Sequence, residues 1–429
     1  MKHIIVAALL LCAFSSCKND TLYEPTDLPP IRPLQFIGRE AGEDSVLLSW
    51  TDMNEEITGF SLLRTNGLSS LTGTISYTEF AHVGSAVRSI GIPFIPDSTT
   101  SSVVYSIRAE RNGIVSSNTG LTVAVSRNFL LTKDYDISST SQPNNAVAFS
   151  PDGSLLAVAN NDQTVKVWKM TNYSFGDVPV RTVTVGAAAG SVRITPDKTQ
   201  LITGGGDGAV KVWDLSSGSL LGTLTGHTAG VYSLDVSPDG GTLISGSYDS
   251  TVRVWDLSSR VLKYSVPKSA AYITAVAFHP SGTSFFAGTS DGTVRTFTTA
   301  TGAEGAAVTH GSGWVYALAF SPDGARFATG GSDNIVKVWN TSGRTLYTTF
   351  TEHTNWVTGV AFSNSGRMLF TVSKDKSLKA WRLSDKTRMS SMTGSEEKFS
   401  VAADPRGFGA ATAGGSAVQY WRYATLSVH

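Results

Sequence analysis

Residues 210–214 read Val-Lys-Val-Trp-Asp, and close copies of this segment return along the chain. The copies lie at 165–168, 252–256, 294–297, 336–340, 378–381 and 418–421. Each copy ends on an aromatic residue, and these residues follow one another at intervals of 45, 42, 42, 42, 42 and 40 positions. A period of this length is typical of a protein built from repeated supersecondary units.

A second marker keeps the same register. Turns of the Ser-Pro-Asp-Gly type begin at Ser150, Thr195, Ser237, His279, Ser321, Ser363 and Asp404. The second turn residue precedes the aromatic residue by 17 positions in six repeats and by 16 in the last. Proline presets φ in such a turn and glycine accepts a positive φ, so each turn should join two antiparallel strands, such as 317–320 and 326–329. Four short strands per repeat form a blade, and blades bury their faces on one another by closing into a ring.

This pattern over residues 129–425 resembles WD40 repeats, which form β-propellers, most often with seven blades. The resemblance implies that the outermost strand of the last blade comes from the N-terminal end of the domain. We therefore expect Phe129-Leu130-Leu131-Thr132 to pair with residues 415–421 and close the ring. The predicted fold is all-β, with a seven-bladed WD40-type propeller at 128–429.

Two repeats contain a His, a hydroxyl and an Asp that could be mistaken for a hydrolase triad. The sets are His227, Ser245, Asp249 and Trp255, and His353, Thr371, Asp375 and Trp381. In both, the His precedes the Trp by 28 positions and the Asp precedes it by 6. Equivalent triads on different blades cannot share one substrate. The resemblance implies instead a buried hydrogen-bond network within each blade.

The other repeats match this network less well. His310 lies one position out of register, which leaves its role doubtful, and Gly415 replaces the Asp in the seventh repeat. We therefore expect blades 3 and 6 to be the best cross-linked and blade 7 the loosest.

No motif points to an enzyme, a cofactor or a metal. The chain lacks GxxxxGK[ST], HExxH, GxSxG and CxxC, and its seven His residues are scattered without metal-ligand spacing. Lys+Arg and Asp+Glu are both 34, so a basic nucleic-acid-binding surface is not supported.

Aromatic residues gather at two positions of the repeat. One is the loop that leads into the first, inner strand of a blade, and the other is the residue just before the Asp that precedes the repeat's aromatic residue by six positions. In blades 3 to 6 these positions hold Tyr232, Tyr248, Tyr272, Trp314, Tyr316, Trp356 and, at the margin, Lys374. Blades 1, 2 and 7 have mostly small or polar residues there, such as Asn145, Asn161, Ala188, Gly190 and Gly206. Exposed Trp and Tyr are typical interface anchors, although the rings could instead pack on adjacent loops to shield the rim.

The N-terminus has the features of an export signal. Lys2 precedes an apolar run from Ile4 to Phe14 that is too short to span a bilayer, followed by Ser15-Ser16-Cys17. This resembles a bacterial lipoprotein signal, which implies cleavage after residue 16 and lipidation of Cys17; an ordinary signal with an incidental Cys17 is the alternative. Residues 17–33 carry four prolines and are predicted to form an extended tether.

Residues 34–127 alternate apolar and polar positions between Gly, Asn and Ser clusters, which favours a β-sandwich. Trp50 in an early segment and Tyr105-Ser106-Ile107-Arg108-Ala109 resemble a fibronectin type III domain, with another immunoglobulin-like sandwich as the alternative.

Together these features predict a monomeric, lipid-anchored protein of the bacterial cell envelope, at the outer membrane or cell surface. Its membrane contact is the lipid alone, its partner is a protein or peptide, and it needs no cofactor. Because aromatic surfaces also stack on sugars and propellers can host hydrolases, glycan binding or glycan processing is the rival function. A glycan-processing enzyme would need convergent acids on the propeller face.

Overall fold

The computed structural model of the protein describes backbone and side chains for residues 142–170, 175–176, 178–407 and 409–422, and for Ile137. The backbone alone is described for the other residues of the strands between 35 and 138, and for residues 171, 174, 423, 427 and 428. Cys17, the tether and the side chains of the region 34–127 lie outside the described residues.

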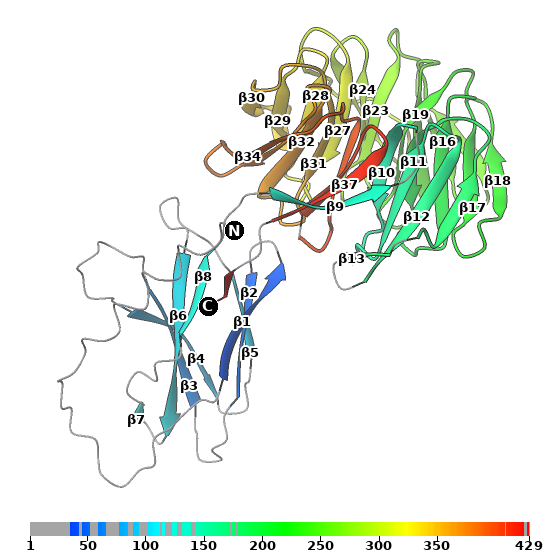
Figure 1. Cartoon of the computed structure of the whole chain (residues 1–429). Coiled ribbons are helices and arrows are strands. Elements are labelled where there is room, and N and C mark those ends of the chain that lie inside the picture. Colours follow the sequence, from blue (N-terminus) through cyan, green and yellow to red (C-terminus); the bar gives the residue numbers. More distant parts are fainter. Residues whose placement is uncertain are drawn as a thin grey trace.

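Residues 142–423 and strand β9 form a ring of seven antiparallel sheets, which confirms the seven-bladed propeller (Figure 1). Blade 1 contains β10 (Asn144–Phe149), β11 (Leu155–Asn160), β12 (Thr164–Thr171), the short β13 (Ser174–Phe175) and β14 (Arg181–Thr184). Blade 2 contains β15 (Ala189–Ile194), β16 (Gln200–Gly205), β17 (Val210–Asp214) and β18 (Leu220–Leu224). Blade 3 contains β19 (Val231–Val236), β20 (Thr242–Ser247), β21 (Val252–Asp256) and β22 (Val261–Ser265).

The remaining blades repeat this order. Blade 4 contains β23 (Ile273–Phe278), β24 (Ser284–Thr289), β25 (Thr293–Thr298) and β26 (Val308–Thr309). Blade 5 contains β27 (Val315–Phe320), β28 (Arg326–Gly331), β29 (Val336–Asn340), the 3-10 turn η2 (Ser342–Arg344) and β30 (Leu346–Phe350). Blade 6 contains β31 (Val357–Phe362), β32 (Met368–Ser373), β33 (Ser377–Arg382) and β34 (Thr387–Thr393). Blade 7 contains β35 (Ser400–Ala403), β36 (Gly409–Ala413), β37 (Ala417–Tyr423) and β9 (Leu131–Ser138).

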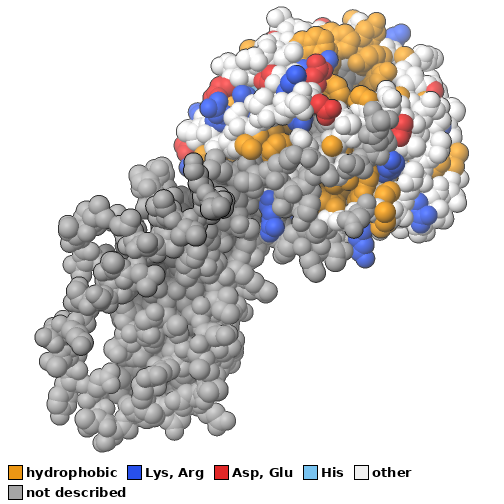
Figure 2. All heavy atoms as spheres, viewed as in Figure 1, with side chains coloured by type: hydrophobic (Ala, Val, Ile, Leu, Met, Phe, Trp, Pro, Cys, Tyr) orange, Lys and Arg blue, Asp and Glu red, His pale blue; other side chains and the backbone are white. Residues whose placement is uncertain are grey.

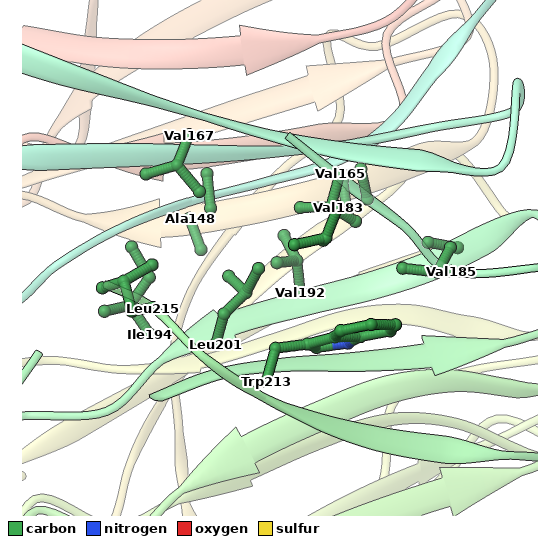
Figure 3. Packing of buried hydrophobic residues seen from close by; sticks show 14 residues of the cluster. Ala148, Val165, Val167, Val183, Val185, Val192, Ile194, Leu201, Trp213 and Leu215 are labelled. Carbon is green, nitrogen blue, oxygen red and sulfur yellow. The ribbon is translucent and has the colours of Figure 1, made fainter. Parts of the chain in front are cut away.

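The second strand of each blade is buried on both faces because each blade lies between two others. Every residue of β20 is buried, whereas the outer strand β22 alternates exposed and half-buried residues. The apolar core therefore lies between blades: Val165 and Val183 of blade 1 pack with Val192, Leu201 and Trp213 of blade 2 (Figure 3). Such burial of apolar side chains stabilises the ring by about 25 cal/mol per Å² removed from water.

The predicted turns have the expected chemistry. In blade 3 the amide of Gly240, at φ 76°, donates to the carbonyl of Ser237, and the Ser237 hydroxyl donates to Asp239 Oδ1 at 2.5 Å. In blade 2 the same turn places Lys198 at φ 59°. A side chain in this left-handed region is strained, so the remaining turn bonds hold it there.

The closing strand begins later than predicted. β9 pairs with all of β37, from Leu131 opposite Tyr423 to Ser138 opposite Ala417, so the predicted segment 129–132 supplies only its first two residues (Figure 1). The prediction followed the apolar run Phe129-Leu130-Leu131. An outer strand is solvated on one side, however, and here the buried side chain described is Ile137, which packs between blades 1 and 7. The pairing still covers the outer edge of β37 and completes the four strands of blade 7.

The region before the propeller contains two further sheets, described by their backbone. One has the order β1 (Gln35–Gly42), β2 (Ser45–Thr51), β5 (Ser89–Pro93). The other has the order β38 (Ser427–Val428), β8 (Thr122–Ser126), β6 (Ser102–Arg111), β3 (Gly59–Thr65), β4 (Tyr77–Gly84), with β7 (Ile114–Val115) paired to β6. The chain therefore returns after the propeller to add a short strand to this second sheet.

Candidate functional site

The predicted triad in blade 3 is a closed hydrogen-bond chain. The indole Nε1 of Trp255 donates to Ser245 Oγ at 2.8 Å, and Ser245 Oγ lies 2.7 Å from His227 Nε2. On the other side of the ring, His227 Nδ1 lies 2.8 Å from Asp249 Oδ2. A neutral imidazole satisfies every bond, since Nε2 accepts from the serine hydroxyl and Nδ1–H donates to the carboxylate. The Ser245 hydroxyl is thus committed to its neighbours.

Burial keeps this imidazole neutral. It lowers the pKa of His227, and the nearby Asp249 only partly offsets that effect. Burial alone would raise the pKa of Asp249, but hydrogen bonds from Thr251, His227 and the amide of Thr228 outweigh it and lower the pKa to about 2. The His227 side chain is 0% exposed and that of Asp249 only 5%. A substrate cannot reach either group.

Blade 6 repeats the arrangement. His353 lies 2.8 Å from both Asp375 Oδ2 and Thr371 Oγ1, and the Trp381 indole donates to the same threonine at 2.9 Å. The structure therefore gives these eight residues a role in tying each blade's strands together.

Blade 5 contains a third network, although the sequence left the role of His310 in doubt. His310 Nδ1 lies 2.7 Å from Thr329 Oγ1, which accepts from Trp339, and Nε2 lies 3.3 Å from Asp333 Oδ1. The one-residue offset is absorbed by exchanging the roles of the two ring nitrogens. His310 is out of register by one position, as the spacing indicated, and it still joins Thr329 and Asp333.

Blade 2 has the same frame without a histidine. Val185 stands 28 positions before Trp213, whose indole donates to Thr203 Oγ1 at 3.0 Å. A small pocket lined by Val185, Thr203, Asp207 and Lys211 lies there. Within the described part of the chain, no group of three or more His, Cys, Asp or Glu side chains could hold a metal ion, and no helix is long and apolar enough to cross a bilayer.

The predicted surface residues of blades 3 to 6 come together as one continuous array, here called the aromatic ridge. It consists of Tyr232, Tyr248, Tyr272, Trp314, Tyr316 and Trp356. Successive ring centroids lie 4.5 to 5.8 Å apart, with near-parallel stacking in the pairs Tyr248–Tyr272 and Tyr316–Trp356. Aromatic pairs at such distances stabilise one another by about 0.5–1.5 kcal/mol, so the ridge is a preformed surface.

Backbone hydrogen bonds explain why residues from separate loops converge. In each of these blades the residue before the turn Asp donates its amide to the loop residue that precedes the inner strand. The Tyr248 amide donates to Gly230 O at 3.1 Å, and the Lys374 amide donates to Trp356 O at 3.0 Å. The loop residue before the inner strand and the residue before the turn Asp therefore lie side by side on one face of the propeller.

The ridge is partly open to solvent. Tyr272 is 46% exposed, Tyr232 42% and Trp356 39%, whereas Tyr248, Trp314 and Tyr316 are half-buried. Burial raises the pKa of Tyr248 to about 12. Figure 2 shows apolar side chains gathered along the upper edge of the propeller, where Figure 1 labels β24 and β28. Partial exposure of rigid rings is the condition for an interface anchor.

The two ends of the ridge differ. At blade 3, Tyr232 lies against glycines: a Cβ on Gly190 would come within 2.6 Å of its Cδ1 atom. At blade 6 the Lys374 ammonium lies 4.3 Å from the centroid of the Trp356 ring. On the opposite sector, the Asn145 amide donates to the carbonyl of Ala189 at 3.0 Å, and Asn161 is exposed. The aromatic surface is thus confined to one side of the ring.

Family comparisons agree with this architecture. A family model described as IFT122 first beta-propeller matches residues 189–417, and one described as WD domain, G-beta repeat matches residues 143–169. No curated protein matches the chain. WD40 propellers typically serve as non-catalytic scaffolds that bind other proteins. Because the first match spans more than half of the 429 residues, the chain belongs to the WD40-repeat β-propellers, in the family of the IFT122 first beta-propeller.

Proposed function

We propose that this protein is a non-catalytic scaffold that binds a protein or peptide through the aromatic ridge. The observation that carries the proposal is the continuity of six aromatic rings from blade 3 to blade 6, three of them more than a third exposed. Trp and Tyr on a rigid surface offer large contact area at little cost in conformational entropy. Fold alone would not support this function.

The geometry disfavours the rival glycan functions. A sugar stacks on an open ring face, but Trp356 already has Tyr316 stacked at 5.4 Å and the Lys374 ammonium at 4.3 Å. Glycan hydrolysis needs a pair of available carboxyl groups. The carboxylates of Asp249 and Asp375, which neighbour the ridge in sequence, are held in the His networks. Side chains of a protein can instead pack against ring edges and tyrosine hydroxyls.

The double variant Trp314→Ala, Trp356→Ala tests the proposal. Each anchor desolvated by a partner contributes about 2 kcal/mol, so binding to a partner recovered from envelope extracts should weaken at least about tenfold. The fold should persist, because neither ring belongs to a His network. Asn145→Ala with Asn161→Ala is the matched control on the opposite sector and should bind normally. Full-strength binding by a folded Trp variant would place the site elsewhere, and unfolding would make the rings structural.

We also infer that the mature chain is a monomer anchored in the bacterial envelope by a lipid on Cys17. The support is the apolar run Ile4–Phe14 ending in Ser15-Ser16-Cys17. Cys17→Ala should abolish incorporation of labelled palmitate and partition into detergent, since no acceptor thiol remains at the cleavage site. Continued labelling of the variant would contradict the anchor.

A fibronectin type III-like sandwich at 34–127 would serve as a spacer between that anchor and the propeller. The strand orders β1-β2-β5 and β8-β6-β3-β4 support this, because an immunoglobulin-like sandwich divides its strands between two antiparallel sheets in a similar way. A fragment spanning 34–127 and carrying the 427–429 segment would test it by circular dichroism, where a helical spectrum would contradict the sandwich.

A further inference from the structure

The chemistry of the ridge restricts the partner. Three of the four turn carboxylates beside it are committed to histidines: Asp249 and Asp375 each accept from one, and Asp333 lies 3.3 Å from His310 Nε2. Their side chains are 5%, 7% and 16% exposed. The fourth, Asp291 of blade 4, is exposed, but one of its carboxylate oxygens accepts from the Thr289 hydroxyl at 2.5 Å and from the Thr293 amide at 3.0 Å. Each turn carboxylate beside the ridge thus already has hydrogen-bond partners within its own blade.

The ammonium group of Lys374, at the blade 6 end of the ridge, has no carboxylate partner in the described part of the chain. Lys374 is half-buried against the Trp356 ring, and among the described residues no carboxylate lies within ion-pair distance of its Nζ atom. Glu396 and Glu397 in the next inter-blade loop form no ion pair with it. Lys376, two positions on, is exposed. An ammonium held beside an aromatic ring occupies the place where a partner's cation would bind, and it repels one.

Ring packing also excludes a cage for a small cation. Such a cage needs rings that stand apart around the ligand, whereas the ridge rings contact one another at centroid distances of 4.5 to 5.8 Å. The path of ring centroids from Tyr232 to Trp356 is at most about 21 Å long, which an extended segment of about six residues spans.

From these observations, and resting on the proposed function of the ridge, we propose that the partner is a polypeptide segment of apolar character that carries a carboxylate, and that this carboxylate pairs with Lys374. The pairing fixes the direction of the segment, with its apolar part over blades 3 to 5 and its acidic group at blade 6. Charge complementarity of this kind contributes specificity and orientation in addition to affinity.

A random linear peptide library displayed on phage and selected on the full chain tests the proposal, with the dissociation constants of the enriched peptides then measured as synthetic peptides. The enriched peptides should combine apolar residues with at least one Asp or Glu. Lys374→Gln should weaken their binding about fivefold, and binding to the wild-type chain should weaken as NaCl rises from about 0.05 to 0.5 M. Lys169→Gln, at an exposed lysine on blade 1, removes the same charge as a control and should bind as the wild type does.

Charge reversal gives the decisive comparison. Lys374→Glu should prefer peptides in which the acidic residue is replaced by Lys, reversing the order of affinities seen with the wild-type chain. Enriched peptides without an excess of acidic residues, or equal affinity of Lys374→Glu and wild type, would overturn the acidic partner while leaving the ridge as the site. Selected peptides that bind Trp314→Ala, Trp356→Ala as tightly as wild type would instead overturn the proposed function itself.

Discussion

Substitution His227→Ala tests the structural role of the blade 3 network. The change removes the bonds of 2.7 Å to Ser245 and 2.8 Å to Asp249, and a 3.2 Å contact with Thr251 Oγ1, from a side chain that is 0% exposed. Ser245 loses its partner on the ring but still accepts from Trp255. The Asp249 carboxylate keeps Thr251 Oγ1 at 2.6 Å and the amides of Thr251 and Thr228 at 2.9 and 3.1 Å.

The remaining bonds limit the damage. A buried group stripped of all partners would cost more, but here each neighbour keeps at least one bond, so we expect a loss of about 2 kcal/mol in the free energy of unfolding. For a propeller of this size, that lowers the thermal midpoint by about 3–5 °C. Differential scanning calorimetry measures the thermal midpoint. Urea titration measures the free energy of unfolding, whose dependence on urea concentration should be the same as in the wild type.

Two comparisons make the result interpretable. His353→Ala should give a loss of similar size, and the double variant should give their sum, because blades 3 and 6 share no contact partner. His279→Ala should cost less, since that half-exposed ring bonds only Ser281 and the carbonyl of Gly324 at a turn. A midpoint unchanged to within about 1 °C in His227→Ala, above all with loss of a hydrolytic activity, would refute the structural role.

Two further predictions concern the same networks. Burial lowers the pKa values of His227 and His310, so below the ordinary pKa of 6.5 the unfolded chain binds protons that the folded chain does not. The free energy of unfolding should therefore be full above pH 6.5 and fall as the solution is acidified, less steeply in His227→Ala. The pKa of Asp249 is lowered, so its contribution is lost only below its ordinary pKa of 3.8. Thermal midpoints between pH 7 and 5 check this, and a flat profile would contradict it. Val185→His should rebuild the missing network of blade 2 between Thr203 and Asp207 and raise the thermal midpoint by about 1–2 °C. A fall in the midpoint would mean that the packing of Val185 against Trp213 outweighs the added hydrogen bonds.

The blades and most of their internal networks could be predicted from the sequence. The turns, the strands and the His–Ser–Asp–Trp sets all lie within one repeat of about 42 residues, so their geometry follows from local spacing that recurs along the chain. The resemblance to WD40 repeats implied such a network, and the register then located the partners of His227 and His353. Exact spacing did not identify the role of His310, because an imidazole has two nitrogens and can reach the same kinds of partner from a neighbouring position.

The contacts between blades could be seen only in the folded chain. The closing strand could not be located by apolarity, because β9 joins the ring through backbone pairing with β37 from the far end of the domain. The aromatic positions were visible in the repeat, but whether the rings would meet depended on closure, which brings Tyr248 of blade 3 beside Tyr272 of blade 4 and Trp314 of blade 5. The location of Lys374 over Trp356 likewise depends on side-chain packing, which a period in the sequence does not encode. Local spacing sets the backbone of each unit, whereas the surface that a partner meets arises where separate units pack together.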